Sequence, residues 1–276
     1  MVIGLKKKKV LCIIQARISS SRLPGKVLLT GSNNKSLLET LYKRLLPSKH
    51  IKEIIIATST NQADDLIFDE CKKNNMKVFR GSLPNVLKRY YDCAKKYKGD
   101  IIIRITSDCP LLEYKLIDKL FLEFNRQNCD YLSNVHPATF PDGYDVEIFT
   151  FDSLKKAFKE GNKNYEREHV TPYIWDNPKK FVVKNYYLKK NYSKLRVTLD
   201  YLEDYFLIKK IFNYFENKKN YFDLSDVLKF LKKNKKLIKN KNFNLLKIYR
   251  INMDKLKTVK KSETIDINKL KYEKFK

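Results

Sequence analysis

Residues 13–28 read IIQARISSSRLPGKVL, and the interpretation of the whole chain starts from this stretch. An apolar run at residues 10–14 predicts a buried strand, which leads into a loop with three serines, a Pro-Gly pair, Arg17, Arg22 and Lys26. Guanidinium and ammonium groups, hydroxyls and the free N–H groups at a strand exit all bind phosphate oxygens, so the loop is predicted to hold a polyphosphate. Composition alone leaves open the alternative of a solvated basic loop.

Strand-like and helix-like segments alternate along the first part of the chain. The expected strands are residues 10–14, 51–58, 76–79 and 100–106, and the expected helices are residues 36–46, 61–74 and 84–97. This alternation predicts a mostly parallel sheet covered by helices on both faces, with ligands bound at the carboxyl ends of the strands. The sequence contains neither G-x-x-x-x-G-K-[ST] nor G-x-G-x-x-G, which argues against a P-loop NTPase and a dinucleotide-binding domain.

The rest of the chain gives weaker patterns. Residues 130–149 predict two strands joined by a loop, and residues 165–173 predict a helix that ends near Pro172. Residues 196–199 predict a short strand, and residues 223–240 predict one amphipathic helix that closes the domain.

The stretch at residues 13–28 resembles the N-terminal signature of the CMP-sugar synthetases, the superfamily of CMP-KDO synthetase and acylneuraminate cytidylyltransferase. The F-P-D-G-x-D-V-E run at residues 140–147 resembles the spore-coat polysaccharide branch of that superfamily most closely, and the likeness extends over roughly residues 10–240. The resemblance implies a three-layer α/β/α Rossmann-like nucleotidyltransferase fold with a mixed, mostly parallel sheet. It also implies an enzyme that joins CTP to a sugar or sugar acid, releases pyrophosphate and requires Mg²⁺.

The nucleotide is expected to lie against the basic loop. The predicted nucleotide-binding residues are Arg17, Ser19, Ser21, Arg22, Lys26, Arg80, Arg89 and Ser107, the last of which stands where the family has glycine. Arg17, Arg22 and Lys26, together with Asp108, are also the predicted catalytic residues, because they would neutralise the departing pyrophosphate and bind the metal. Arg80 and Arg89 have the alternative of being ordinary surface arginines.

Two aspartates are predicted to hold Mg²⁺, which prefers one or two carboxylates together with substrate phosphates. Asp108 directly follows the strand at residues 100–106, and Asp200 matches the first acid of the family's V-D-T-P-E-D-L run, in which Tyr201-Leu202 here replaces Thr-Pro. Asp204 is the reserve choice. Either aspartate could instead serve as a helix cap. Three histidines without metal-ligand spacing make a zinc site improbable.

Polar residues later in the chain form a predicted wall for the sugar hydroxyls. They are Asn134, Asp142, Asp145 and Glu147, with Glu168 and His169 added because they match the family's E-H-V-T run. Turn formation by the Pro-Asp-Gly sequence and a structural role for the histidine are the alternatives.

Composition places limits on compartment and domain organisation. The formal charge is +27, and residues 205–276 carry 21 Lys and Arg against 7 Asp and Glu, so the basicity is concentrated near the C-terminus. We expect residues 1–240 to form the catalytic domain and residues 241–276 a lysine-rich, loosely attached or disordered extension. Five irregularly spaced cysteines indicate reduced, mostly buried thiols, and no apolar run suits a signal peptide or a membrane span, so a cytoplasmic protein is expected.

Two other functions are compatible with parts of the sequence. A glycosyltransferase of similar fold would usually carry an Asp-x-Asp triplet, which is absent. A nucleic-acid-binding protein would use the basic tail with interleaved aromatics, namely Tyr214, Phe215, Tyr221, Phe222 and Tyr249. Most of these aromatics have helix-core spacing, which argues against nucleic acid as a partner. The oligomeric state stays open, although the resembled family is often dimeric.

Overall fold

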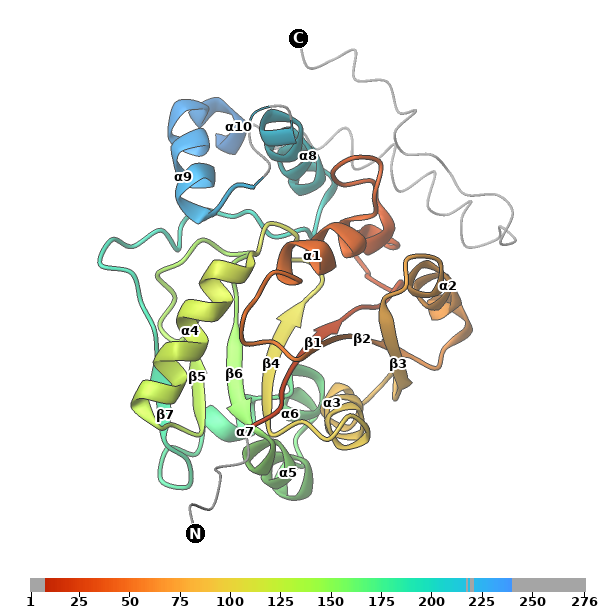
Figure 1. Cartoon of the computed structure of the whole chain (residues 1–276), viewed down its shortest axis with the longest axis vertical. Coiled ribbons are helices and arrows are strands. Elements are labelled where there is room, and N and C mark those ends of the chain that lie inside the picture. Colours follow the sequence, from red (N-terminus) through yellow and green to blue (C-terminus); the bar gives the residue numbers. More distant parts are fainter. Residues whose placement is uncertain (1–7, 217, 219–220, 240–276) are drawn as a thin grey trace.

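The computed structural model describes residues 8–216, 218 and 221–239, and a seven-stranded sheet lies at its centre (Figure 1). The strand order is β3-β2-β1-β4-β6-β5-β7. All neighbouring strands are parallel except the pairs that β6 makes with β4 and β5. The strands are β1 (Val10–Gln15), β2 (Glu53–Ser59), β3 (Lys77–Gly81), β4 (Ile101–Thr106), β5 (Tyr131–Ser133), β6 (Glu147–Thr150) and β7 (Val183–Asn185). The predicted mixed, mostly parallel sheet is therefore confirmed.

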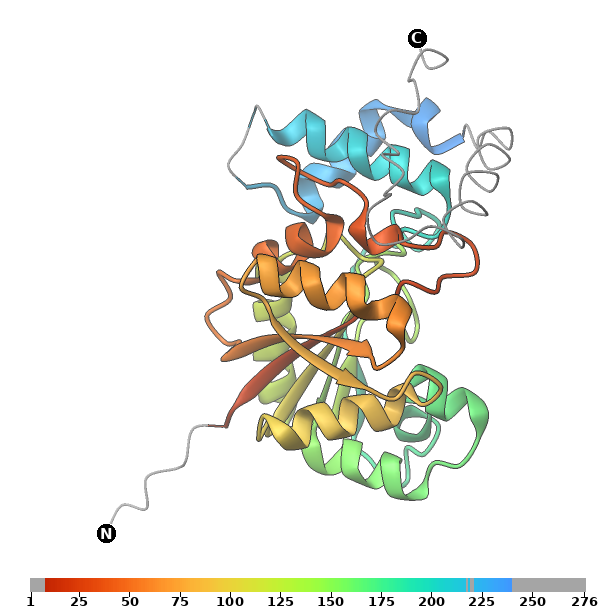
Figure 2. The same cartoon turned by 90° about the vertical axis from the view of Figure 1, so that its right-hand side faces the viewer.

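Helices cover both faces of this sheet. Successive strand residues point to opposite sides, so an apolar strand presents apolar side chains to both helix layers. In β1, Cys12 and Ile14 belong to the core formed with α1 (Leu37–Leu45), α2 (Asp65–Lys73) and α4 (Tyr114–Gln127). Leu11 and Ile13 belong to the core on the other face, formed with α3 (Val86–Lys96), α5 (Phe151–Glu160) and α7 (Pro172–Trp175). Figure 2 shows the sheet between these helix layers. The fold is the expected three-layer α/β/α arrangement.

A helix from late in the chain holds the segment that follows the basic loop. α8 (Leu202–Glu216) lies beside residues 30–33, where the Tyr205 hydroxyl donates to the Thr30 carbonyl at 3.2 Å and the Lys209 ammonium donates to the Gly31 carbonyl at 2.7 Å. At its far end, Glu216 accepts hydrogen bonds from the Ser32 hydroxyl and from a backbone N–H. Positions 175 to 184 residues apart in sequence are thus fixed to each other.

Three predicted elements differ from the observed ones. The helix predicted at residues 165–173 is two helices, α6 (Asn164–His169) and α7, because the chain reverses at Val170, whose φ is 74°, and Pro172 begins the second helix. The strand predicted at residues 196–199 is a single bridge, because its N–H groups bond to the Asp142 and Asp108 carbonyls instead of to one strand. The closing helix is divided at Asn234 into α9 (Leu224–Lys233) and α10 (Lys235–Lys239).

Several compositional expectations have a structural counterpart. All five cysteines are free and buried. Phe215 stacks on Phe222 with ring centroids 4.5 Å apart, so these aromatics belong to the core between α8 and α9 and are not displayed for stacking with bases. Within the described ranges, no helix has the length and apolar composition needed to cross a bilayer. The lysine-rich extension at residues 241–276 and Tyr249 lie outside the described residues.

Candidate active site

The basic loop begins where β1 ends and is anchored by one buried carboxylate. Asp64 accepts hydrogen bonds from the backbone N–H groups of Ile18 at 2.7 Å and Ser59 at 3.1 Å, which ties the loop to the end of β2. Gly25 then closes the loop with φ of 71°, and its N–H donates to the Ile18 carbonyl at 2.9 Å. The anchored backbone leaves four predicted phosphate-binding side chains exposed, those of Arg17, Ser19, Ser21 and Arg22.

Lys26 brings the two predicted metal-binding aspartates together. Only 8% of this residue is exposed, and it begins the short 3-10 helix η1 (Lys26–Leu28). Its ammonium donates to Asp108 Oδ2 at 3.2 Å, to Asp200 Oδ1 at 3.0 Å and to a backbone carbonyl. Asp108 follows β4 and Asp200 precedes α8. Two carboxylates far apart in sequence therefore face one cationic position beside the basic loop.

Arginines surround Asp200 on its other sides. Arg22 Nη2 lies 2.7 Å from Asp200 Oδ1, and Arg196 Nη2 lies 2.7 Å from Oδ2. Burial would raise the pKa of Asp200, but the hydrogen bonds from Arg22 and Arg196 and the charge of Lys26 hold it well below its ordinary value. Arg196 also pairs with Asp142 at 2.8 Å and with Asp204 at 3.2 Å, and so connects three segments around Asp200.

The remaining predicted nucleotide-binding residues have different environments. The guanidinium of Arg80, in β3, donates to two backbone carbonyls and pairs with Asp65 at 2.7 Å, so it stabilises the loop after β2. Arg89, on α3, is only 2% exposed, and its Nε and Nη1 atoms have no hydrogen-bond partner. Burial lowers the pKa of Arg89. Ser107 is buried directly after β4, and its N–H donates to the Gln15 carbonyl at 3.1 Å.

A cavity of about 310 Å³ lies beside this charged centre, between β4, β6 and the α6–α7 segment. Three of the predicted sugar-binding residues line it, namely Asp145, Glu147 and His169. Arg104, Thr106, His136, Thr171 and Trp175 are also part of the lining. The rings of His136 and Trp175 lie against each other with centroids 4.7 Å apart. The cavity thus combines an aromatic wall with hydroxyl, carboxylate and guanidinium groups.

The charges in this cavity are balanced by a buried ion pair. Arg104 Nη1 bonds to Glu147 Oε2, and Glu147 Oε1 accepts the hydroxyl groups of Tyr131, at 2.6 Å, and Thr171. Burial raises the pKa of Glu147, but the charge of Arg104 and the hydrogen bonds from Thr171 and Tyr131 outweigh it, so the pKa lies below its ordinary value. Arg104 Nε is buried without a partner.

The other predicted sugar-binding residues do not line the cavity. The Asn134 side chain donates to the Tyr144 carbonyl at 2.7 Å and accepts the Val146 N–H at 2.9 Å, so both of its polar groups hold the backbone. Asp142 forms the ion pair with Arg196. Glu168 is exposed on α6.

Comparison with known proteins identifies the family. The cytidylyltransferase family model matches residues 11–263. The chain belongs to the cytidylyltransferase family. This cytidylyltransferase is 33% identical over 210 residues to the spore coat polysaccharide biosynthesis protein SpsF of Bacillus subtilis, with 74% of this chain and 86% of that protein covered. The resemblance to the spore-coat branch is therefore confirmed.

Solved structures agree with this assignment. A cytidylyltransferase from Leptospira borgpetersenii serovar Hardjo-bovis superimposes with a TM-score of 0.78 at 37% identity, over 85% of this chain and 98% of that one. CMP:2-keto-3-deoxy-manno-octonic acid synthetase in complex with CTP superimposes with a TM-score of 0.58 at 14% identity, over 75% of this chain and 99% of that one. The second likeness shows a shared fold.

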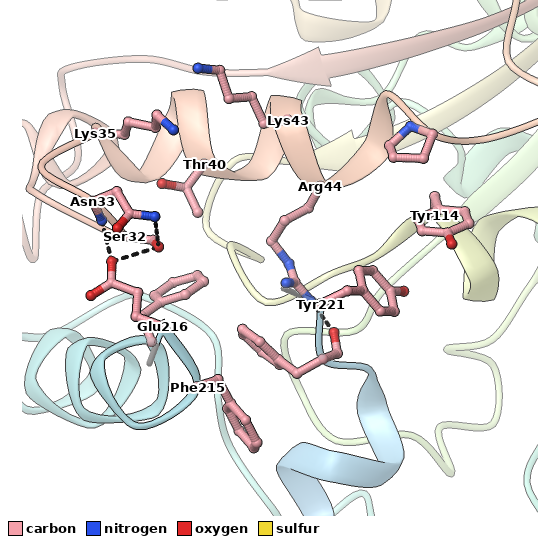
Figure 3. Close-up of a pocket in the computed structure, with 13 residues that line it drawn as sticks. Ser32, Asn33, Lys35, Thr40, Lys43, Arg44, Tyr114, Phe215, Glu216 and Tyr221 are labelled. Carbon is pink, nitrogen blue, oxygen red and sulfur yellow. Dashed lines mark hydrogen bonds between the residues drawn. The ribbon is translucent and has the colours of Figure 1, made fainter. Parts of the chain in front are cut away.

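A larger cavity of this cytidylyltransferase, about 500 Å³, lies between α1 and α8, and none of the predicted site residues lines it (Figure 3). Its polar side chains mainly join elements to each other. Glu216 accepts the hydroxyl of Ser32 at 2.7 Å, and Arg44 donates to the carbonyls of Leu111, Leu112 and Phe222 at 2.9 to 3.1 Å. These structural contacts make the strand ends, and not this cavity, the candidate active site.

Sequence reasoning missed three residues of the site. Arg196 lies four positions before Asp200, and that spacing was the available signal. Arg104 is the one charge in the otherwise apolar strand IIIRIT, which was a second signal. Trp175 gave none, because its position on the cavity wall depends on the turn between α6 and α7.

Proposed function

We propose that this cytidylyltransferase couples CTP to a sugar or sugar acid, giving a CMP-sugar and pyrophosphate. The observation that carries the proposal is the meeting of Lys26, Asp108 and Asp200 at the strand ends, beside Arg22 of the basic loop. In open α/β sheets this edge is where ligands bind. The likeness to SpsF, a spore coat polysaccharide biosynthesis protein, supports a role in surface polysaccharide synthesis, and the synthetase bound to CTP shares the fold.

The chain's own groups suit nucleotidyl transfer, which depends on positioning and charge stabilisation. A sugar hydroxyl attacks the α-phosphorus in line, and the pyrophosphate departs with the bonding electron pair. Arg17, Arg22 and Lys26 bind the phosphates and neutralise the leaving group. The buried and unpartnered donors of Arg89 offer hydrogen bonds to acceptor atoms of the nucleotide. A nucleophilic side chain is not required.

Mg²⁺ fits the same centre. Asp108 and Asp200 present hard carboxylate oxygens, the kind of ligand that Mg²⁺ prefers. Both carboxylates contact the Lys26 ammonium, so they already face one positive charge. Among the residues that the structure describes, no group of three or more His, Cys, Asp or Glu side chains forms a complete metal site. Two carboxylates with substrate phosphates are the usual ligands of Mg²⁺, so Asp108 and Asp200 would hold the ion. When bound, it would stabilise negative charge on the phosphate oxygens.

The cavity lined by Arg104, Asp145 and Trp175 is the proposed acceptor site. Its aromatic wall offers an apolar face, and its polar groups suit hydroxyls. Five free, buried cysteines support the further proposal that the enzyme works in a reducing compartment such as the cytoplasm.

The test is pyrophosphate release from each of the four nucleoside triphosphates with Mg²⁺. The acceptor panel contains 3-deoxy-manno-octulosonate, N-acetylneuraminate, glucose, glucosamine and glucuronate. We expect turnover with CTP and one acceptor class, and loss of turnover in EDTA. Thermal shift with each triphosphate and Mg²⁺ reports nucleotide binding independently of the acceptor. The proposal would be contradicted if CTP did not stabilise the protein and no acceptor gave pyrophosphate release.

A further inference from the structure

Asp145 differs from every other carboxylate near the site. Its side chain lines the acceptor cavity, yet in the described part of the chain it accepts no hydrogen bond and forms no ion pair. Its neighbour Glu147 is saturated by Arg104, Tyr131 and Thr171. Both oxygens of Asp200 are likewise occupied. Asp145 is therefore a carboxylate whose acceptor capacity is free for a ligand.

Asp145 lines the acceptor cavity and is also close to the proposed metal-binding side of the site. Asp145 is close enough to Asp108 and Asp142 for their charges to act on it, and it shares the cavity with Arg104 and Trp175. The attacking hydroxyl must occupy this region, because it has to reach a phosphorus atom held beside Lys26 and Asp108. A free carboxylate between the two substrates can accept a hydrogen bond from that hydroxyl.

The other basic groups of the cavity are less suitable for this task. Glu147 already accepts three hydrogen bonds, which stabilise its charge and make it a weak base. The His136 ring packs against Trp175 on the outer wall, and His169 is exposed at the end of α6.

We infer that Asp145 is the general base of the transfer reaction, a catalytic role that rests on the proposed function. An Asp145 oxygen takes the proton of the attacking hydroxyl as the new bond forms between that oxygen atom and the α-phosphorus. The bond from the α-phosphorus to the bridging oxygen breaks, and pyrophosphate leaves with the electron pair. Asp145 then returns the proton to solvent. The net products are the CMP-sugar, pyrophosphate and one proton.

The electrostatics agree with this role. Burial and, after it, the negative charges of Asp142, Asp108 and Glu147 together raise the pKa of Asp145 to about 7, and the charge of Arg104 opposes them. A general base is most effective when its pKa lies near the working pH.

The experiment compares Asp145→Asn, which keeps the shape and removes the basicity, with Asp152→Asn, a matched change at an exposed carboxylate on the first turn of α5. Pyrophosphate release is measured with CTP, Mg²⁺ and the best acceptor of the panel, or with water as acceptor through CTP hydrolysis. CTP binding is measured by calorimetry. We expect Asp145→Asn to lower kcat by about 100- to 10,000-fold with CTP affinity unchanged, and Asp152→Asn to resemble wild type. Asp145→Glu should recover part of the rate.

The outcomes separate the two proposals. Wild-type turnover together with a fully active Asp145→Asn variant would overturn the general base and leave the proposed function standing. Equal losses of CTP affinity and kcat/KM in Asp145→Asn would also overturn it, because the carboxylate would then act on the nucleotide. A wild-type protein that neither binds CTP nor releases pyrophosphate would remove the proposed function, and the inference with it.

Discussion

Two charged centres lie near the carboxyl end of β4, and they differ in how open they are. Around Lys26 the central side chains are buried, with 10% of Lys26 and 14% of Asp200 accessible, but their outer partners are partly exposed, with 49% of the Arg22 side chain and 30% of the Asp108 side chain accessible. Around Arg104 the pair with Glu147 is closed, with 13% and 7% accessible, and two hydroxyl groups cover it. Partners in an open centre can be exchanged for a ligand, whereas those in a closed centre cannot be lost without a large cost. The comparison predicts that changes at the first centre reduce turnover and that changes at the second reduce stability.

The largest effect is expected at Asp108. Asp108→Asn removes a proposed metal ligand and one partner of Lys26, and should lower kcat/KM by about 1,000- to 10,000-fold. Because this carboxylate is partly exposed, the melting temperature should change little. Steady-state kinetics over a Mg²⁺ titration and a thermal melt measure both quantities. A fully active variant would exclude Asp108 from the chemistry.

Glu147→Gln should show the opposite pattern. It leaves the Arg104 guanidinium buried without its counter-charge, which costs about 3–5 kcal/mol of unfolding free energy. Urea denaturation measures the loss. Glu160→Gln, which breaks the exposed pair with Lys180, is the matched control and should leave stability nearly unchanged. Equal stability of the two variants would mean that the Arg104 centre is not closed in solution.

Arg22→Ala sharpens the comparison within the open centre. One charge-assisted hydrogen bond contributes about 1.5–3 kcal/mol, so the variant should use CTP about 10- to 150-fold less well. Arg126→Ala, at an exposed arginine on α4 that pairs with Glu123, controls for loss of one positive charge. Unchanged kinetics in Arg22→Ala would remove the basic loop from the mechanism.

The smallest effect concerns the pH dependence of stability. The pKa of Asp145 is raised from 3.8 to about 7, so the folded state binds its proton more tightly than the unfolded state does. The stability from this group is complete below about pH 4 and is lost as the pH rises through about 7. Relative to Asp145→Asn, the wild type should lose unfolding free energy over that interval. Urea denaturation of both proteins at both ends of the interval measures this loss. A difference in unfolding free energy between them that did not change with pH would contradict the prediction.

Glu147 has the reverse sign. Its lowered pKa means that its contribution is present above the ordinary value of 4.5 and is lost as the pH falls through the folded value. Two carboxylates two residues apart thus respond to pH in opposite directions, because one has a cationic partner and the other does not.

The fold was predictable where local chemistry decides structure. The apolar runs at β1, β2 and β4 and the Ser36 cap of α1, whose hydroxyl accepts the Glu39 N–H at 3.0 Å, follow from period and capping alone. The segment at residues 196–199 was predicted wrongly as a strand. It has strand-like residues, but its hydrogen bonds go to Asp142 and Asp108, partners that only the tertiary structure supplies.

The sequence predicted which types of residue form the site better than it predicted the contacts that each side chain makes. Arg22, Lys26, Asp108 and Asp200 were selected as charged residues at expected strand ends, and the structure brings them together. Asn134 and Arg80 carry equally suitable groups, yet both bond mainly to backbone. Sequence does not reveal whether a polar side chain is already satisfied, and that property separates Asp145 from Glu147.

The docking of α8 against residues 30–33 has a consequence for synthesis of the protein. Asp200 and the helix that follows it emerge from the ribosome only after every strand of the sheet has been made. Until then Lys26 lacks its Asp200 partner, and Thr30 and Gly31 lack the side chains of α8 that hold them. A nascent chain that stops short of α8 would therefore have all strands of the sheet but an incomplete site at their carboxyl ends. The site would be completed only when Asp200 and α8 are synthesised.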